Sequence, residues 1–250
     1  MPIETFEIPP DLIAVLKVNQ KIAALTGAGI SAESGVPTFR EAQTGLWSRY
    51  DPAQLATPEA FDRDPQLVWE WYAWRRLLIS KAQPNPGHYA LVELESHFPE
   101  FSLITQNVDG LHRLAGSRST IELHGDISRT RCSLEDIQIA EWSETGENPP
   151  LCPRCGGLLR PDVVWFGESL PETAIQAAFE IASNCQIFFS IGTSTVVEPA
   201  ASLPFLAMQN GAQIIEVNID QTTLTASADW HFAASAGQVL PALVRELIRN

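Results

Sequence analysis

The order of apolar runs along the chain is the feature that most constrains its fold. Five short runs are rich in Ile, Leu, Val and Phe and do not alternate with polar residues, which is typical of parallel strands covered on both faces. They span residues 21–26, 101–105, 186–191, 213–217 and 230–233. Helical patterns accompany them at residues 11–19, 88–98, 171–183, 199–209 and 238–249. This alternation predicts an α/β fold built on a doubly wound, Rossmann-like parallel sheet.

Two segments interrupt the alternation. Residues 33–86 have no strand pattern but many aromatic side chains, and residues 126–165 are polar, rich in turns and carry three of the 4 cysteines. We expect both to be insertions that together form a smaller second domain, helical and resembling a zinc ribbon. The large domain would then comprise approximately residues 11–32, 87–125 and 166–250, and the two domains would form a single unit over residues 1–250.

The charge balance excludes some classes of partner. The chain has 30 acidic and 16 basic residues, a net charge of −14. Nucleic acids and anionic membranes are bound by clustered cations, so we expect neither as a partner; lysine-bearing partners suit this charge. No apolar run reaches about 18 residues, the length of a membrane span. The N-terminal residues do not resemble a signal peptide, and 4 cysteines are too few for a disulfide scaffold, which favours a cytoplasmic location.

A glycine-rich turn follows the first predicted strand. The sequence Gly27-Ala28-Gly29-Ile30-Ser31-Ala32 fits the G-x-G-x-x-G/A pattern, in which backbone N–H groups approach a pyrophosphate. Tight glycine turns also occur for purely steric reasons. A hydride-transfer enzyme should continue into a second strand that ends in an acidic residue. Residues 33–40 instead read as a loop containing Gly and Pro, which disfavours that class of enzyme.

The wider motif resembles a known family. Residues 27–40 (GAGISAESGVPTFR) are similar to the cofactor motif of the sirtuins, which are NAD-dependent protein deacylases. The resemblance covers about residues 12 to 248, and further blocks follow in the family's order. They are TQNVDGLH (105–112), ELHG (122–125), RPDVVWFGE (160–168), GTS (192–194), VEPAASLP (197–204) and VNID (217–220).

The resemblance implies a reaction in which NAD is consumed. The oxygen of acyl-lysine would attack the ribose carbon that carries nicotinamide, and the products would be free lysine, nicotinamide and O-acyl-ADP-ribose. His124 would be the catalytic base, with Asn107 as a second catalytic residue. A lone histidine is more often packed or exposed than catalytic, but its side chain titrates near neutral pH and can accept a proton from a hydroxyl. His112 is the rival candidate, and we expect it to support the loop.

The cofactor would contact several segments. Gln106, Asn107 and Asp109 follow the second predicted strand, where they could merely cap a helix but where ligands of such sheets also bind. The resemblance assigns NAD binding to Gly27, Ala28, Gly29, Ser31 and Ala32 of the turn, to Phe39 and Arg40 of the next loop, to Gln106, Asn107 and Asp109, to Gly192, Thr193 and Ser194, to Asn218, Ile219 and Asp220, and to Ala236. Phe39 would shield the reaction centre from water.

Residues 163–168 (VVWFGE) read as an apolar edge strand. From the residues alone, packing in the core is the simpler interpretation. The resemblance implies that Val164, Trp165, Phe166 and Gly167 pair with the extended backbone of the substrate.

A predicted helix around Tyr72 and Arg75 is rich in aromatic and basic residues, and it indicates which acyl group the protein would remove. Tyr72 and Arg75 are three residues apart, so they share one face. A guanidinium and a phenol in an apolar tunnel would bind a carboxylate through charge-assisted hydrogen bonds. This Tyr-x-x-Arg pattern resembles the sirtuin class that removes succinyl, malonyl and glutaryl groups, and the small Ala56 would leave room for a longer acyl chain. The simpler alternative is a helix with an aromatic core face and a solvated basic end.

The metal site of the family is incomplete here. Sirtuins usually bind structural zinc with two C-x-x-C pairs. Cys152 and Cys155 form the second pair, but the first is broken, because Glu135 stands where a partner for Cys132 is expected. Three thiols and a carboxylate predict zinc less firmly than four thiols. Glu135 or Asp136 could supply an oxygen ligand, or packing alone could hold the segment.

Three other functions stay open at this point: a deacetylase without preference for acidic acyl groups, a mono-ADP-ribosyltransferase, and a non-catalytic NAD-sensing module. Acyl-lysine proteins or peptides are the expected partners, and a monomer is the expected state.

Overall fold

A six-stranded parallel sheet forms the centre of the protein. The structure, a computed structural model, describes residues 6–37, 51–142 and 148–248. The sheet has the order β3-β2-β1-β6-β7-β8, and every adjacent pair is parallel. Its strands are β1 (Lys21–Thr26), β2 (Glu100–Thr105), β3 (Thr120–Glu122), β6 (Ile187–Ile191), β7 (Gln213–Val217) and β8 (Trp230–Phe232). The order reverses between β1 and β6, which confirms the predicted doubly wound topology.

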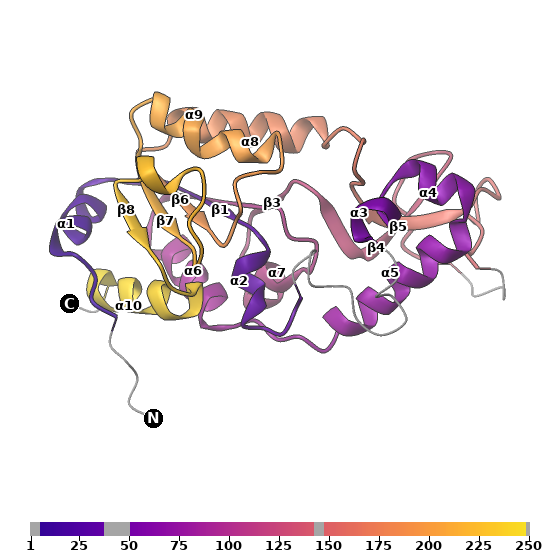
Figure 1. The fold of residues 1–250 in the computed structure, drawn as a ribbon, viewed down its shortest axis with the longest axis horizontal. Helices are drawn as coiled ribbons and strands as arrows, with labels where there is room; N and C mark the ends of the chain where they lie inside the picture. Colours follow the sequence, from indigo (N-terminus) through magenta and orange to yellow (C-terminus); the bar gives the residue numbers. More distant parts are fainter. Residues whose placement is uncertain (1–5, 38–50, 143–147, 249–250) are drawn as a thin grey trace.

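Helices cover both faces of this sheet. Figure 1 shows α8 (Glu172–Asn184) and α9 (Leu203–Gln209) on one side, and α6 (Pro86–His97) and α10 (Ala236–Ile248) on the other, where α1 (Pro10–Val18) also packs. Successive side chains of a strand point to opposite faces. In β1, Ile22 and Ala24 therefore join one hydrophobic cluster while Ala23 and Leu25 join the other. Burial on both faces explains why the strand sequences show no polar alternation.

The predicted elements are present with small shifts of their ends. The helix predicted over residues 199–209 begins as a 3-10 turn, η2 (Ala200–Ser202), before α9. Strand β3 was not predicted, because it has only three residues and none of them is fully buried. The remaining short elements of this region are α2 (Ala28–Ala32), α7 (Leu111–Ala115) and η3 (Thr225–Ser227).

A smaller group of elements lies at the other end of the molecule (Figure 1) and is called the small lobe below. It comprises α3 (Pro52–Leu55), α4 (Pro58–Arg63), α5 (Pro65–Ile79), β4 (Gly125–Cys132) and β5 (Leu159–Val163). Strands β4 and β5 pair antiparallel, with an irregularity between Asp126 and Thr130. Side chains of α5 and of both strands share hydrophobic clusters, so the two inserted segments pack on each other. The domain boundaries given above stay a prediction.

The edge strand predicted over residues 163–168 is wrong. Strand β5 ends at Val163, and the chain turns at Phe166 and Gly167, where Gly167 has a φ of 89°. The backbone N–H groups of Val164 and Trp165 are used locally, by the His124 carbonyl at 3.0 Å and the Glu168 carboxylate at 2.8 Å. The apolar composition of this segment reflects the burial of Trp165, not a ladder of strands.

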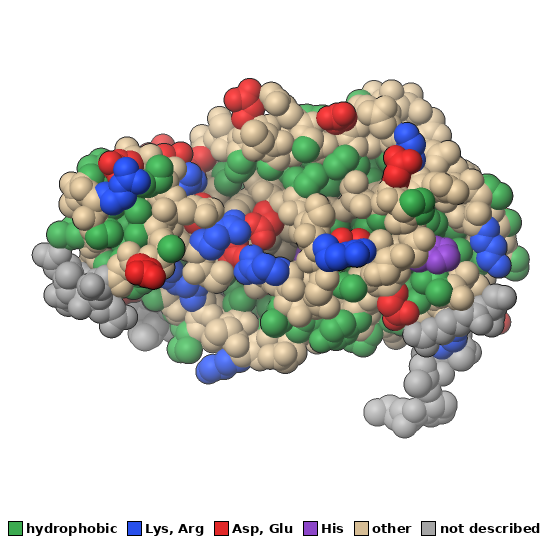
Figure 2. All heavy atoms as spheres, turned by 180° about the vertical axis from the view of Figure 1, so that it is seen from behind, with side chains coloured by type: hydrophobic (Ala, Val, Ile, Leu, Met, Phe, Trp, Pro, Cys, Tyr) green, Lys and Arg blue, Asp and Glu red, His purple; other side chains and the backbone are tan. Residues whose placement is uncertain are grey.

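Acidic and basic side chains are interspersed on the face of the molecule that Figure 2 shows. Among the described residues, no helix is both long enough and apolar enough to cross a membrane.

Candidate functional site

The glycine turn lies where the strand order reverses. The N–H of Gly27 donates to the Ile191 carbonyl at 2.9 Å, and that of Gly29 donates to the Gly192 carbonyl at 2.8 Å. A Cβ atom at Gly27 would lie 2.7 Å from the Gly192 oxygen, and one at Gly29 would lie 2.7 Å from the Gly192 Cα. The steric explanation therefore holds for both glycines. The turn follows the end of β1 directly, so it lies at the carboxyl edge of the sheet, where ligands of such folds bind.

The residues that follow β2 reach across to this turn. The Asn107 side chain donates to the Gly27 carbonyl at 3.0 Å and to the Ser31 hydroxyl at 3.2 Å. The Ser31 hydroxyl in turn donates to Asp109 at 2.7 Å. Asp109 also accepts the Leu111 N–H at 2.9 Å at the start of α7, from the position before the N-cap residue Gly110. Burial raises the pKa of Asp109, against the effect of these hydrogen bonds.

A second group of predicted residues surrounds a small cavity at the same edge. Gly29, Gly192, Asn218, Ile219 and Ala236 are among the residues that line it. The structure thus brings together residues from four of the predicted segments.

Thr193 links the two groups. Its hydroxyl oxygen accepts a hydrogen bond from the Gln106 side-chain N–H at 2.9 Å. Its backbone carbonyl accepts one from the Asn218 side-chain N–H, also at 2.9 Å. The other predicted cofactor residues of the described chain are exposed, namely Ala28, Ala32, Ser194 and Asp220. Phe39 and Arg40 lie outside the described residues.

His124 lies between β3 and β4 with one ring nitrogen already engaged. Its Nδ1 is 2.9 Å from the Gln106 carbonyl oxygen. A carbonyl can only accept, so Nδ1 carries the proton and Nε2 keeps its lone pair. Burial lowers the pKa of His124 below 6.5, partly opposed by this hydrogen bond. The ring is therefore neutral at neutral pH, with a basic nitrogen available.

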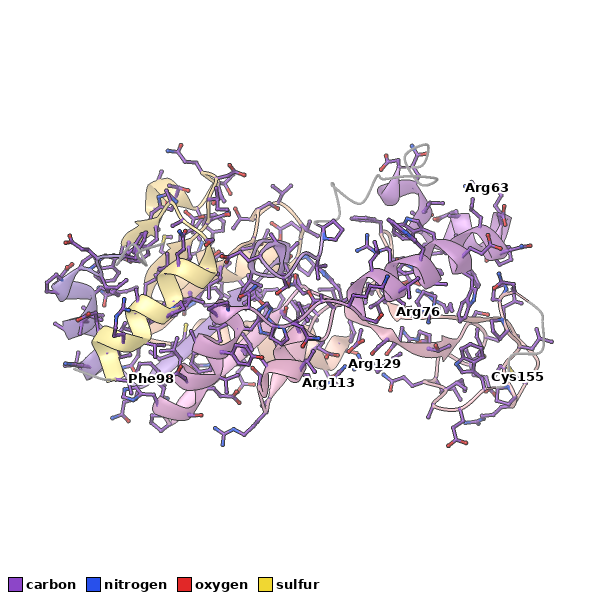
Figure 3. All side chains as sticks on the ribbon, turned by 90° about the horizontal axis from the view of Figure 1, so that it is seen from below. Arg63, Arg76, Phe98, Arg113, Arg129 and Cys155 are labelled. Atoms are coloured by element: carbon purple, nitrogen blue, oxygen red, sulfur yellow. The ribbon has the colours of Figure 1, made fainter. Side chains whose placement is uncertain are left out.

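Ion pairs hold the chain on both sides of His124. Arg113 lies 2.7 Å from Asp126, and Arg129 lies 2.6 Å from Glu122. Figure 3 shows the two arginines close together, at the waist between the two ends of the molecule. Burial alone would raise the pKa of Asp126, but hydrogen bonds from Ser128 and the Arg113 guanidinium lower it overall. The histidine thus lies in a short segment fixed at both ends.

His112, the rival candidate, is buried behind the turn. Its Nε2 is 2.9 Å from the Thr26 hydroxyl, and its ring lies against that of His88 with the centroids 4.9 Å apart. Burial lowers the pKa of His112 to about 3 and that of His88 to about 4. Both rings are therefore neutral parts of the core.

Tyr72 and Arg75 both point into the protein from α5, and both are buried. The Tyr72 hydroxyl oxygen accepts the indole N–H of Trp165 at 3.0 Å. The Arg75 guanidinium lies over the Trp71 ring, 5.1 Å from its centroid. Burial raises the pKa of Tyr72 to about 12 and lowers that of Arg75; the nearby guanidinium opposes the Tyr72 shift. The simpler prediction of a solvated basic end is wrong for Arg75.

The turn at residues 164–167 meets another motif singled out in the sequence. The Phe166 N–H donates to the Ala56 carbonyl at 2.8 Å. Ala56 is buried, and the Phe166 side chain is half exposed. The small alanine and the VVWFGE segment therefore lie side by side near Tyr72.

The cysteines and the carboxylate of the incomplete zinc motif come together. One ligand atom each from Cys132, Glu135, Cys152 and Cys155 lies within 4.8 Å of the others. Tetrahedral zinc with bonds of about 2.3 Å to sulfur requires ligands about 3.8 Å apart, so the four residues fit this ion. Figure 3 shows Cys155 at the far tip of the small lobe. The alternative ligand Asp136 instead pairs with Arg131 at 2.8 Å.

Comparison with known proteins decides the family. A profile described as the Sir2 family matches residues 27–199. The chain belongs to the Sir2 family. The NAD-dependent protein deacylase of Aquifex aeolicus (strain VF5) is 57% identical over 219 residues, which cover 87% of this chain and 91% of that protein. The NAD-dependent protein deacylase of Pyrococcus abyssi (strain GE5 / Orsay) is 50% identical over 96% of this chain and 98% of its own.

Solved structures of Sir2 homologues have the same fold. A Sir2 homolog–NAD complex superposes with a TM-score of 0.90 at 46% identity, covering 97% of this chain and 95% of that one. A triple mutant of a Sir2 homologue in complex with 2'-O-acetyl ADP ribose gives a TM-score of 0.89 at 47% identity, covering 97% of both chains. The resemblance seen in the sequence is thus confirmed.

Two features of this Sir2-family site could not be found in the sequence. The ion pairs around His124 join residues with no shared motif. The hydrogen bond from Trp165 to Tyr72 joins positions 93 residues apart; the only signal for it was that both residues lay in segments singled out independently.

Proposed function

We propose that this Sir2-family protein is an NAD-dependent protein-lysine deacylase that prefers acyl groups ending in a carboxylate. The observation that carries the deacylase assignment is the neutral His124, with a basic Nε2, at the carboxyl edge of the sheet beside the glycine turn. Its relatives support it: several are named NAD-dependent protein deacylase, and Sir2 structures hold NAD or 2'-O-acetyl ADP ribose. One Sir2 structure holds both NAD and a p53 peptide, which suggests peptide substrates here.

Each group in the site has a proposed task. NAD would supply the ribose carbon that receives the acyl oxygen, with nicotinamide as the leaving group. His124 Nε2 accepts a proton from a ribose hydroxyl, while the Gln106 carbonyl keeps Nδ1 protonated and the ring in place. Asn107 and Asp109 line the nicotinamide and ribose side, and their bonds to Gly27 and Ser31 fix their orientation. The cavity near Asn218 would take the adenosine half.

The acyl preference rests on the burial of Arg75. A buried guanidinium is stabilised by nearby negative charge, and burial lowers the pKa of Arg75. A carboxylate at the end of a succinyl or malonyl chain would add such a charge beside it. Tyr72 would add a hydrogen bond, and Ala56 would leave space for the chain.

Paired peptides of one sequence test the preference. Acetyl-, succinyl- and malonyl-lysine peptides are incubated with NAD, and products are followed by mass spectrometry. We expect faster loss of succinyl or malonyl groups. Arg75→Met should lower desuccinylation about 100-fold, the scale of losing one desolvated charge pair of about 3 kcal/mol, and lower deacetylation far less.

Arg63→Met is the matched control. Arg63 is exposed on α4, so its substitution should leave both rates unchanged. Faster deacetylation by the unmodified protein, or an equal loss of both activities in Arg75→Met, would contradict the acyl preference. Neither result would affect the deacylase assignment itself.

The Cys132, Glu135, Cys152 and Cys155 cluster is proposed as a structural zinc site, remote from the reaction. The monomeric state and the cytoplasmic location stay predictions of the sequence.

A further inference from the structure

The indole of Trp165 makes a directed contact with Tyr72. The Trp165 side chain is 3% exposed, and its Nε1 lies 3.0 Å from the Tyr72 oxygen. An indole N–H can only donate, so the phenol oxygen must accept. The single proton of the Tyr72 hydroxyl is therefore directed to some other acceptor.

The Trp165 ring is held in this position from several sides. The Arg160 guanidinium lies 3.4 Å from the ring centroid. Glu168 binds Arg160 through both carboxylate oxygens, at 2.6 and 2.8 Å, and also accepts the Trp165 backbone N–H at 2.8 Å. The Phe61 ring packs 5.2 Å away. Rotation of the indole away from Tyr72 would break up this packing.

Arg75 and Trp165 present hydrogen-bond donors near the phenol, and the one carboxylate that also raises the Tyr72 pKa, that of Glu168, is engaged by Arg160 and by the Trp165 backbone N–H. Arg75 has only donors, and Trp165 donates its one proton to Tyr72. The Tyr72 pKa of about 12 keeps its hydroxyl protonated at neutral pH, so this group donates as well. A carboxylate, which only accepts, is the acyl terminus that matches such a site.

We propose that Trp165 is a positioning residue for acyl selectivity: its indole N–H orients the Tyr72 hydroxyl so that its proton points toward the carboxylate of the acyl group. This inference rests on the proposed preference for carboxylate-bearing acyl groups. It gives the Trp165 side chain a role distinct from the substrate-backbone pairing that the resemblance implies for residues 164–167. The simpler alternative is that Tyr72 merely satisfies a buried indole.

A double-mutant cycle separates the two interpretations. The substitutions Trp165→Phe, Tyr72→Phe and both together are compared by kcat and KM on succinyl- and acetyl-lysine peptides. Trp165→Phe should lower the succinyl-to-acetyl ratio of kcat/KM about tenfold. In the Tyr72→Phe background the same change should have almost no further effect, because no hydroxyl remains to orient.

Trp230→Phe is the matched control. It removes an indole N–H that donates to Asp11 at 3.1 Å, on β8 of the large sheet, and should leave the ratio unchanged. If Trp165→Phe fails to fold, β-(3-benzothienyl)alanine at position 165 keeps the ring shape without the N–H.

The outcomes distinguish this inference from the function it rests on. A wild-type protein without succinyl preference overturns the acyl preference and this inference with it. A wild-type preference that persists in Trp165→Phe overturns the inference alone. The inference is also overturned if Trp165→Phe lowers the succinyl-to-acetyl ratio of kcat/KM equally with Tyr72 present and in the Tyr72→Phe background. That result would mark Trp165 as a packing residue.

Discussion

His124 can act as a base because of one backbone carbonyl. Gln106 accepts from Nδ1, which leaves the lone pair on Nε2. The sequence predicted His124 through the motif around it, but not the tautomer, since residues 106 and 124 are not adjacent in the chain. The same limit applies to Trp165, which a local pattern placed in a strand and whose hydrogen-bond partner lies on α5.

The pKa of His124 sets the acid side of the pH profile. Burial lowers this pKa below 6.5, and only the unprotonated ring can accept a proton. We expect kcat/KM to rise with pH along a limb centred below pH 6.5 and to be level near neutral pH. In the His124→Ala variant this limb should disappear, and kcat/KM should fall about 10²–10⁴-fold. A limb centred above pH 6.5, or one retained in His124→Ala, would assign the base to another group.

At the scale of elements, the large sheet was predictable strand by strand except for β3, whereas the small lobe was predictable only as a second unit, without its strands β4 and β5. Strands buried on both faces leave a continuous apolar run, as in β6, and their alternation with helices fixes the topology. The antiparallel pair β4 and β5 contains charged side chains such as Arg129, Arg131, Arg160 and Asp162, which pair with one another across the ribbon or with acids beyond it. Apolar residues do not recur at regular intervals in such strands. The sequence of this region therefore resembles a polar segment rich in turns.

The stability of the small lobe should depend on a bound metal. The ligand set of Cys132, Glu135, Cys152 and Cys155 predicts one zinc per chain, with Glu135 as its weakest ligand because Arg154 competes for it at 3.5 Å. Elemental analysis should find zinc near one equivalent, and chelation should lower Tm by several degrees. Glu135→Cys should retain zinc at higher chelator concentration than the wild type, and Glu135→Ala should lose it sooner. Purified protein that is free of zinc and has the same Tm with and without added zinc would favour packing alone.

At the scale of the whole molecule, stability should fall in mild acid. His88 and His112 have pKa values of about 4 and about 3 in the folded protein, against 6.5 when exposed. The unfolded chain therefore binds more protons below pH 6.5, so stability is full above that pH and falls toward pH 4. Each histidine should lower the free energy of unfolding by roughly 2 kcal/mol between pH 7 and pH 5.

Denaturant unfolding at several pH values measures this loss. His112→Gln should reduce the pH dependence of the unfolding free energy by about half, whereas His97→Gln, at an exposed site, should leave it unchanged. The same dependence in the His112→Gln variant and in the wild type would show that other groups, such as carboxylates, cause the loss.

Product stoichiometry is the first measurement to make on NAD-dependent deacylation by this protein. The purified protein is incubated with NAD and acyl-lysine peptides, acetyl and succinyl in parallel, and nicotinamide, freed lysine and acylated ADP-ribose are quantified together. We expect one of each per turnover and none with His124→Ala. ADP-ribose joined to a protein side chain would indicate a transferase, and NAD binding without nicotinamide release would indicate a sensor; either result would show that the protein is not a deacylase.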